Sequence, residues 1–139
     1  MIKIYIDTNV FINAIENRDN NISKKVLIFL ENIKDINIYL NDLSIINIHY
    51  IGRKSTEKSE LNKTLKTIIN SYNLISIDKN IIEDALNSNF KDFEDGIQYF
   101  CAKKVETDII ITSNTKDFKS SSIKILSPKE FYDKFIMEN

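Results

Sequence analysis

Short runs of β-branched and other apolar residues alternate along this chain with longer segments in which apolar residues recur every three or four positions. The first pattern is typical of strands and the second of amphipathic helices. Strands that alternate with helices predict a parallel sheet, because the chain must cross back over the sheet before it can add the next parallel strand. We therefore expect an α/β fold with three layers (α/β/α), in which helices cover both faces of a central parallel sheet.

The expected strands cover residues 2–6, 36–40, 74–77, 109–112 and 123–126. The expected helices cover residues 10–15, 22–34, 45–52, 56–72, 79–88, 93–105 and 128–135. Asp42 or Ser44, Asp78 and Ser127 are suited to cap three of these helices at their N-termini. Residues 1–139 have the length of one ordinary domain and contain no segment typical of a linker, so we expect a single domain.

Composition excludes several kinds of site. Cys101 is the single cysteine and His49 the single histidine, so the chain forms no internal disulfide framework and no zinc site made of several Cys and His residues. We expect Cys101 to pack in the core and His49 to be a partly buried structural residue. The formal net charge of −1 supplies no strong positive field for nucleic acid. No apolar run approaches the length of a membrane span, so we expect a cytoplasmic protein without membrane association.

Polar residues that directly follow strands are the first candidates for a functional site, because parallel strands bring their carboxyl ends to one edge of the sheet. Asp7 follows the first strand, and Asn114 and Asp117 follow the strand at 109–112. Asp95 begins the helix that leads into that strand. Several oxygen ligands without histidine or thiol favour Mg²⁺ or Mn²⁺. The sequence therefore predicts a site that binds phosphate groups through such an ion.

Each of these carboxylates also has a purely structural interpretation. Asp7 is placed to cap the helix that follows it, Asp95 to belong to a capping arrangement begun by Asp92, and Asp117 to be a turn residue. If the first and fourth strands are central parallel neighbours, however, Asp7, Asp95 and Asp117 lie around one cavity. Capping does not require that arrangement, so it would favour a functional site.

Three segments resemble the sequence blocks of the PIN domain family. Residues 4–12, Ile-Tyr-Ile-Asp-Thr-Asn-Val-Phe-Ile, resemble its opening strand and helix, and residues 93–98 and 110–118 resemble its later blocks in the expected order and spacing. The resemblance covers essentially the whole chain. It is closest to compact bacterial PIN proteins, many of which are VapC-like toxins of toxin–antitoxin pairs.

The resemblance implies a metal-dependent endoribonuclease. In this family the positions of Asp7 and Asp95 hold Mg²⁺ or Mn²⁺, and Asp117 matches an acidic position that orients the attacking water or completes the coordination. The ion would activate the water and stabilise charge on the phosphodiester of the RNA substrate. As a toxin, the protein would need an antitoxin whose chain covers the crevice, and such PIN proteins commonly form homodimers.

Two residues depart from the family pattern. Asn47 and Asn114 stand where the family usually has acidic residues, and each keeps an oxygen ligand but removes a charge. A site with less charge should hold one ion more readily than two and hold it more weakly. Thr8, Asn9 and Ser113 are candidates to support the metal ligands or to contact phosphate.

Two other functions are open on the sequence alone. A receiver-like or flavodoxin-like module has the same layered sheet, but a receiver has a further acidic pair after its first strand and a lysine at the end of its last strand, both lacking here. A PIN-like domain that has lost catalysis and binds RNA or protein is the second. Four lysines are expected to flank the site and are candidates to meet phosphate: Lys103, Lys104, Lys116 and Lys119.

Overall fold

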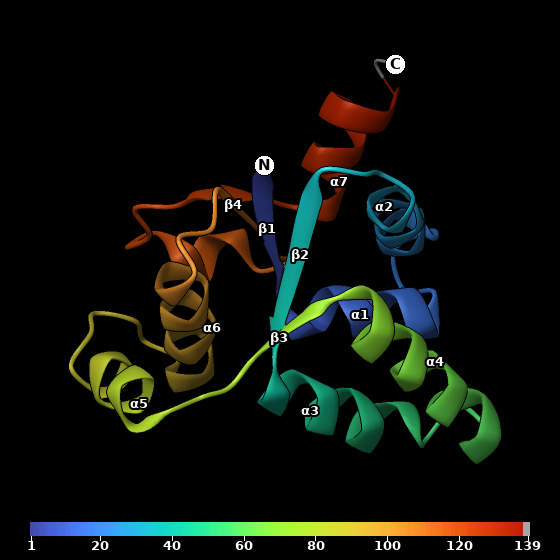
Figure 1. The fold of residues 1–139 in the computed structure, drawn as a ribbon, viewed down its shortest axis with the longest axis horizontal. Helices are drawn as coiled ribbons and strands as arrows, with labels where there is room; N and C mark the ends of the chain where they lie inside the picture. The colour runs from blue at the N-terminus through green and yellow to red at the C-terminus, as the bar shows by residue number, and fades with distance from the viewer. Residues whose placement is uncertain (138–139) are drawn as a thin grey trace.

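In the computed structural model, which describes residues 1–137, parallel strands form one five-stranded sheet (Figure 1). The strands are β1 (Ile2–Ile6), β2 (Ile36–Asn41), β3 (Asn73–Ile75), β4 (Ile109–Ile111) and β5 (Lys124–Leu126). Their order in the sheet is β3-β2-β1-β4-β5, and β1 pairs with β4 so that Ile4 lies opposite Ile109. The expected fold class and the central pairing of the first and fourth strands are confirmed.

The helices are α1 (Thr8–Glu16), α2 (Ile22–Glu31), α3 (Asp42–Gly52), α4 (Lys58–Ser71), α5 (Lys79–Leu86), α6 (Phe93–Lys104) and α7 (Pro128–Phe131). A 3₁₀ turn, Thr115–Phe118, follows β4, and a π-helical turn, Tyr132–Met137, continues α7. Several elements are shorter than expected, among them α2 and β3. The Asn32 side chain donates to the carbonyl of Ile28 as α2 ends, and the Ile77 amide donates to Asp42 instead of extending β3.

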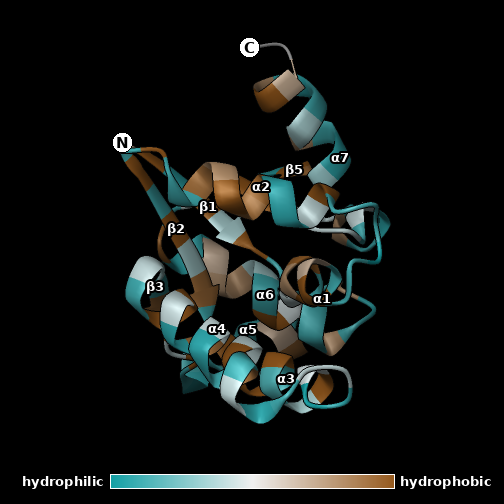
Figure 2. Ribbon diagram, turned by 90° about the vertical axis from the view of Figure 1, so that its right-hand side faces the viewer, coloured by the Kyte–Doolittle hydropathy of each residue, from teal (hydrophilic) through white to brown (hydrophobic). Residues whose placement is uncertain are grey.

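The helices divide between the two faces of the sheet, which confirms the three layers. Side chains of a strand alternate between faces, so Ile4 and Ile6 of β1 enter the core beneath α1, α2 and α4, whereas Tyr5 enters the core beneath α5 and α6. Figure 1 shows α5 and α6 on one side of β1 and β2, and α1, α2 and α4 on the other. Figure 2 shows hydrophobic residues along β1 and β2.

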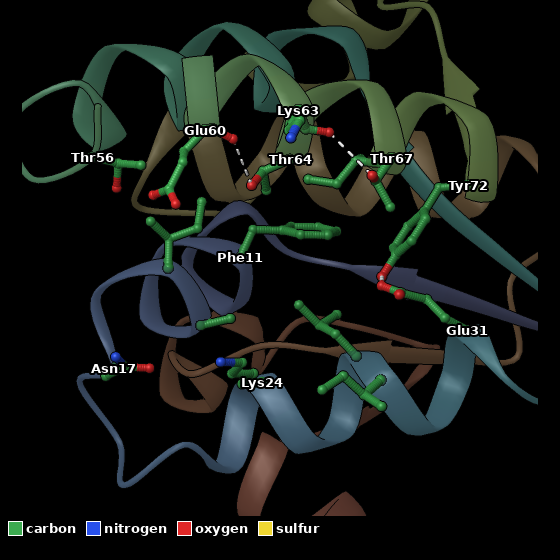
Figure 3. Close-up of a pocket in the computed structure, with 15 residues that line it drawn as sticks. Phe11, Asn17, Lys24, Glu31, Thr56, Glu60, Lys63, Thr64, Thr67 and Tyr72 are labelled. Carbon is green, nitrogen blue, oxygen red and sulfur yellow. Dashed lines mark hydrogen bonds between the residues drawn. The ribbon is translucent and has the colours of Figure 1, made fainter. Parts of the chain in front are cut away.

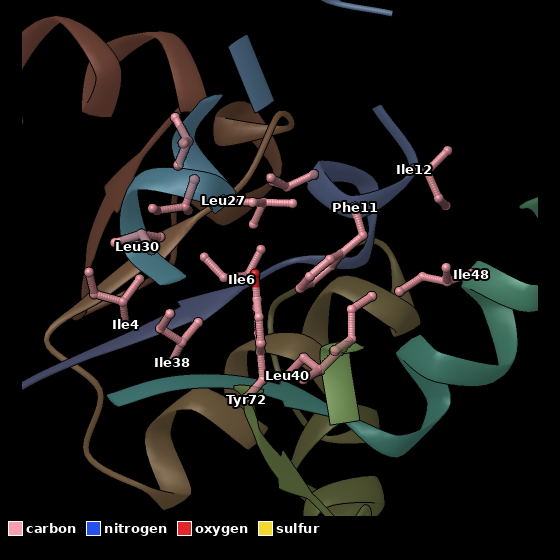
Figure 4. Packing of buried hydrophobic residues seen from close by; sticks show 14 of the residues in the cluster. Ile4, Ile6, Phe11, Ile12, Leu27, Leu30, Ile38, Leu40, Ile48 and Tyr72 are labelled. Carbon is pink, nitrogen blue, oxygen red and sulfur yellow. The ribbon is translucent and has the colours of Figure 1, made fainter. Parts of the chain in front are cut away.

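The larger core joins β1, β2, β4 and β5 to α1, α2, α3, α4 and α7, and Figure 4 shows part of it. Phe11 of α1 packs against Tyr72, which follows α4, with ring centroids 5.4 Å apart. On the other face, Cys101 is fully buried, as expected for a packing residue. His49 is exposed, so its expected partial burial is wrong. The buried face of α3 carries Ser44, Ile48 and Gly52, and His49 lies beside that face rather than on it.

The caps of the helices differ from expectation at one position. Asp78 caps α5, and Ser127 forms a complete capping box with Glu130 at α7, as expected. The cap of α3 is Asn41, whose side-chain oxygen accepts from the Ser44 amide at 2.7 Å, and not Asp42 or Ser44. No helix within residues 1–137 is long and apolar enough to cross a bilayer.

We predict that Ser127→Ala lowers the free energy of unfolding by about 1 kcal/mol, the usual loss when a capping hydroxyl is removed. The Ser127 hydroxyl accepts from the Glu130 amide at 3.0 Å, and no other side chain replaces it there. Urea denaturation measures the change. Ser120→Ala, at an exposed serine, is the control and should leave stability unchanged; equal stability of both variants would contradict the prediction.

Candidate active site at the carboxyl edge of the sheet

Asp7 stands where β1 turns into α1. Its amide donates to the carbonyl of Ile111 at 3.0 Å, which continues the β1–β4 ladder by one residue. Asp7 occupies the N-cap position of α1, yet its side chain makes no capping hydrogen bond. Its Oδ2 instead accepts from the Thr112 hydroxyl at 2.7 Å and from the Asn9 side chain at 3.3 Å. The carboxylate is therefore held by the neighbouring strand rather than used as a helix cap.

Asp95 occupies the first turn of α6. Its amide donates to Oδ1 of Asp92 at 3.1 Å, so Asp92 caps the helix, and only the backbone of Asp95 takes part in that cap. Its carboxylate has no hydrogen bond or ion pair within residues 1–137, although the residue is only 9% exposed. Capping explains the position of Asp92 but not the burial of the Asp95 carboxylate.

The pKa shifts of Asp7 and Asp95 indicate that the predicted carboxylates lie near one another. Burial raises the pKa of Asp7 to about 6, although the Thr112 hydroxyl and the amides of Thr8 and Asn9 counteract part of the rise. Burial also raises the pKa of Asp95 to about 7, and the negative charges of Asp7, Asp92, Asp117 and Glu94 raise it further. Because the charges of Asp7 and Asp117 both act on Asp95, the three carboxylates lie within electrostatic range of one another at one edge of the sheet. Asp117 itself is exposed, on the 3₁₀ turn after β4.

The carboxylate oxygens at this edge of the sheet are suitable ligands for a divalent cation. Asp7 and Asp95 are buried, close and unpaired with any cation in residues 1–137, so their negative charge is uncompensated. The described residues hold no group of three or more His, Cys, Asp or Glu side chains arranged around a metal position. Two protein carboxylates are nevertheless what Mg²⁺ commonly uses, because it retains several of its water ligands.

Polar residues of α1 and the β4 loop surround Asp7. Asn9 donates to Asp7 through its nitrogen, and its oxygen accepts from the Ser113 amide at 3.1 Å. The Ser113 hydroxyl lies 2.9 Å from the side-chain nitrogen of Asn13. The Asn114 amide donates to the Thr112 hydroxyl, and the Asn114 side chain is exposed. Asn9, Ser113 and Asn114 therefore lie at the predicted edge.

Asn47 lies on α3, half-buried, three residues after Ser44. The Ser44 hydroxyl is 2.6 Å from that of Thr8, the residue after Asp7. Residues three apart on a helix share a face, so Asn47 is on the side of α3 that meets the start of α1. Its side chain forms no hydrogen bond within the described chain, and its role as a ligand stays a prediction.

Two of the four lysines lie away from the carboxylates. Lys104 pairs with Asp78 at 2.8 Å, and the Lys103 ammonium lies over the ring of Phe100. Both occupy the last turn of α6, whereas Asp95 occupies the first, and a 12-residue helix is about 18 Å long. Their expected position beside the site is therefore wrong.

Five buried polar residues beside the site were not predicted. Thr112 directly follows β4, but the expected strand at 109–112 included it, so the rule that selected Asp7 did not select Thr112. The other four are Tyr5, Asn41, Ser44 and Gln98, which are at most 4% exposed and hydrogen-bonded to one another or to Thr8. The sequence contains one indication that Gln98 lies near the site, because this residue follows Asp95 by one helical turn. Asn41 also had a signal, because it directly follows the expected strand at 36–40. Tyr5 and Ser44 lie within an apolar strand and an apolar helix and gave no signal for the site.

A separate groove of about 570 Å³ lies between α1, α2 and α4 (Figure 3). Its apolar lining includes Phe11, Leu27, Ile28 and Ile68, and charged residues from two helices border it. The charged residues are Lys24, Glu31, Glu60 and Lys63. None of the three carboxylates lines this groove, so the groove and the acidic edge are separate features.

Comparison with known proteins agrees with this geometry. The sequence model of the PIN domain family matches residues 3–116, which include most of β1, Asp7, Asp95 and β4. This chain belongs to the PIN domain family. A curated relative, Ribonuclease VapC1 of Aquifex aeolicus (strain VF5), is 31% identical over 141 residues, which cover 96% of this chain and 95% of the relative.

Solved structures share the fold of this PIN domain at low sequence identity. VapBC2 from Rickettsia felis, bound to a DNA fragment from its promoter, contains a chain that matches with a TM-score of 0.66 at 15% identity, covering 91% of this chain and 98% of that one. A toxin–antitoxin complex from Klebsiella pneumoniae matches with a TM-score of 0.66 at 20% identity, covering 90% and 97%.

We predict that the metal-free protein loses stability as pH rises from 5 to 8. The folded-state pKa values of Asp7 and Asp95 lie above that of an unfolded Asp, about 4. Between these values the folded protein binds more protons than the unfolded chain. The stabilisation is therefore complete below about pH 4 and is lost as pH passes through 6 and 7.

Urea denaturation in EDTA measures this effect against an Asp7→Asn, Asp95→Asn double variant. The wild-type protein should lose roughly 4 kcal/mol more than the variant between pH 5 and pH 8. An identical pH dependence in the two proteins would show that neither carboxyl group has a raised pKa.

Proposed function

We propose that this PIN domain is a Mg²⁺- or Mn²⁺-dependent endoribonuclease and the toxin of a toxin–antitoxin pair. The observation that carries the proposal is the pair of buried, uncompensated carboxylates, Asp7 and Asp95, at the carboxyl edge of the sheet. A divalent cation would neutralise this pair and give it an affinity for phosphate. The similarity to a protein named as a ribonuclease supports RNA as the substrate.

Each residue of the edge has a distinct task in the proposed reaction. Asp7 and Asp95 would hold the ion, which supplies positive charge to a phosphodiester and makes a nearby water more acidic. Thr112 and Asn9 orient the Asp7 carboxylate through their hydrogen bonds to Oδ2. In this proposal exposed Asp117 would accept a proton from the attacking water. Ser113 would donate a hydrogen bond to the RNA backbone.

We predict that Asp7→Asn and Asp95→Asn each reduce RNA cleavage by on the order of 100-fold or more, because each variant removes half of the charge that holds the ion. Neither variant should melt at a lower temperature, since each relieves repulsion between buried carboxylates. Cleavage of a labelled single-stranded RNA in Mn²⁺ and thermal melting in EDTA measure the two effects. Asn47→Glu, which adds a charged group on α3, should tighten Mn²⁺.

Glu94→Gln is the matched control, because Glu94 is exposed, lies beside Asp95 in the same helical turn and loses the same charge. This variant should keep its activity. A wild-type protein that binds a cleavage-resistant RNA equally well in EDTA and in Mn²⁺, and that cleaves no RNA, would overturn the proposal. The protein would then be a PIN-like binding domain without catalysis, the alternative raised by Asn47 and Asn114.

The antitoxin is proposed to occupy the groove between α1, α2 and α4. The groove combines apolar lining with bordering charges of both signs, which suits a peptide that presents apolar side chains between polar ones. Helix α1, which is about 13 Å long, begins at Thr8 directly after Asp7, and its later residues line the groove. A chain that lies in the groove can therefore extend to the acidic edge and cover it. Structural neighbours that are toxin–antitoxin complexes support such a partner.

We predict that Ile28→Glu weakens antitoxin binding by roughly 10-fold or more, because it places a charge in the apolar part of the groove. The probe, titrated by calorimetry, is the product of an adjacent gene, provided that this gene encodes a DNA-binding N-terminus and a disordered tail. Ile28 and Ile69 are each 51% exposed, but only Ile28 lines the groove. Ile69→Glu is therefore the matched control, and equal weakening by both variants would place the antitoxin elsewhere.

A homodimer stays a prediction. Exposed apolar residues one helical turn apart occur on α3, at Ile46 and Tyr50, and on α5, at Ile82 and Leu86. These two pairs are part of the exposed apolar surface that a second copy of the chain could contact.

A further inference from the structure

We propose that Gln98 is a positioning residue that fixes Asp95 relative to Asp7 through a closed ring of buried hydrogen bonds. The inference rests on the proposed metal site and names a residue that acts on that site without touching the ion.

The ring joins five side chains from both layers of helices and the strands between them. Gln98 donates to the Thr8 hydroxyl at 3.0 Å and accepts from the Tyr5 hydroxyl. Tyr5 accepts from the side-chain nitrogen of Asn41 at 2.8 Å, and Asn41 in turn accepts from the Ser44 amide. The Ser44 and Thr8 hydroxyls, 2.6 Å apart, close the ring.

Three of the five members of the ring stand next to a residue of the predicted site. Thr8 follows Asp7 in the chain, and Gln98 lies one turn after Asp95 on α6. Ser44 lies one turn before Asn47 on α3. The Gln98–Thr8 hydrogen bond is thus a direct link between the segment that carries Asp7 and the helix that carries Asp95.

The link opposes a specific force. Asp7 and Asp95 repel each other, and no cation of the described chain lies between them. Helix α6 would relieve this repulsion by moving away from β1. The Gln98 side chain, which is 4% exposed, resists that movement because breaking its hydrogen bonds would leave buried polar groups unpaired. The carboxylates are therefore held at a fixed separation before an ion binds.

The test compares Mn²⁺ affinity in Gln98→Met with the wild-type protein. Met has a similar length but neither donates nor accepts a comparable hydrogen bond, so the variant cuts the link and keeps the packing. Removing a partner that orients a metal ligand commonly weakens affinity by about 10- to 100-fold, and we expect a loss in that range. Electron paramagnetic resonance of free Mn²⁺, well below the melting temperature, measures it without reference to RNA cleavage.

Tyr99→Phe separates positioning from general stability. Tyr99 is the next residue on α6 and is 5% exposed, but its hydroxyl bonds to Ser122 on the other side of the helix. This control should lower the melting temperature while its Mn²⁺ affinity stays that of the wild type. Thr8→Val cuts the same link from the other end and replaces Gln98→Met if that variant does not fold. The double variant should bind Mn²⁺ no more weakly than the weaker single one.

Three outcomes decide the proposal. Weaker Mn²⁺ binding in Gln98→Met and Thr8→Val, without it in Tyr99→Phe, supports it. Unchanged affinity in the first two variants overturns the positioning role while the metal site stands. A wild-type protein that binds no Mn²⁺ overturns the metal site and the positioning role together.

Discussion

The pairing of β1 with β4 is the constraint on which the rest of the structure depends. These strands are separated by about a hundred residues in the sequence, yet their backbone ladder continues into the bond between the Asp7 amide and Ile111. It brings Thr112 within 2.7 Å of the Asp7 carboxylate. It also fixes α6, which must run back across the sheet to deliver β4, so that its first turn carries Asp95 to the same edge.

Burial of like charges at that edge is unfavourable for the isolated chain. Desolvation and mutual repulsion raise the pKa values of both Asp7 and Asp95, whereas most acidic residues of a domain lie on the surface, where water screens them. Structural roles do not account for the arrangement, because Asp92 caps α6 and the Asp7 side chain caps nothing. A cation bound between Asp7 and Asp95 would remove this unfavourable electrostatic energy. Such an arrangement is typical of a functional site.

Particular residues show how far sequence reasoning reached. The strands, the capping box at Ser127 and the three carboxylates followed from local chemistry, because strand alternation, cap preference and the position after a strand are all visible along the chain. His49 was placed wrongly because α3 is apolar on several sides, which hides its true buried face. Lys103 and Lys104 were placed wrongly because they are close to Asp95 in the sequence but lie at the opposite end of α6.

The sequence by itself determined the layered parallel sheet, the family and the acidic residues at the ends of strands. These features depend on interactions between neighbours in the chain or on patterns that repeat along it. Only the tertiary structure decided which polar residues meet Asp7 and Asp95. Tyr5 and Gln98 are 93 residues apart, and Tyr5 lies in an apolar strand, so nothing local marks them as partners. Their contact exists because the sheet order places β1 beneath α6, and the hydrophobic packing of both faces determines that order.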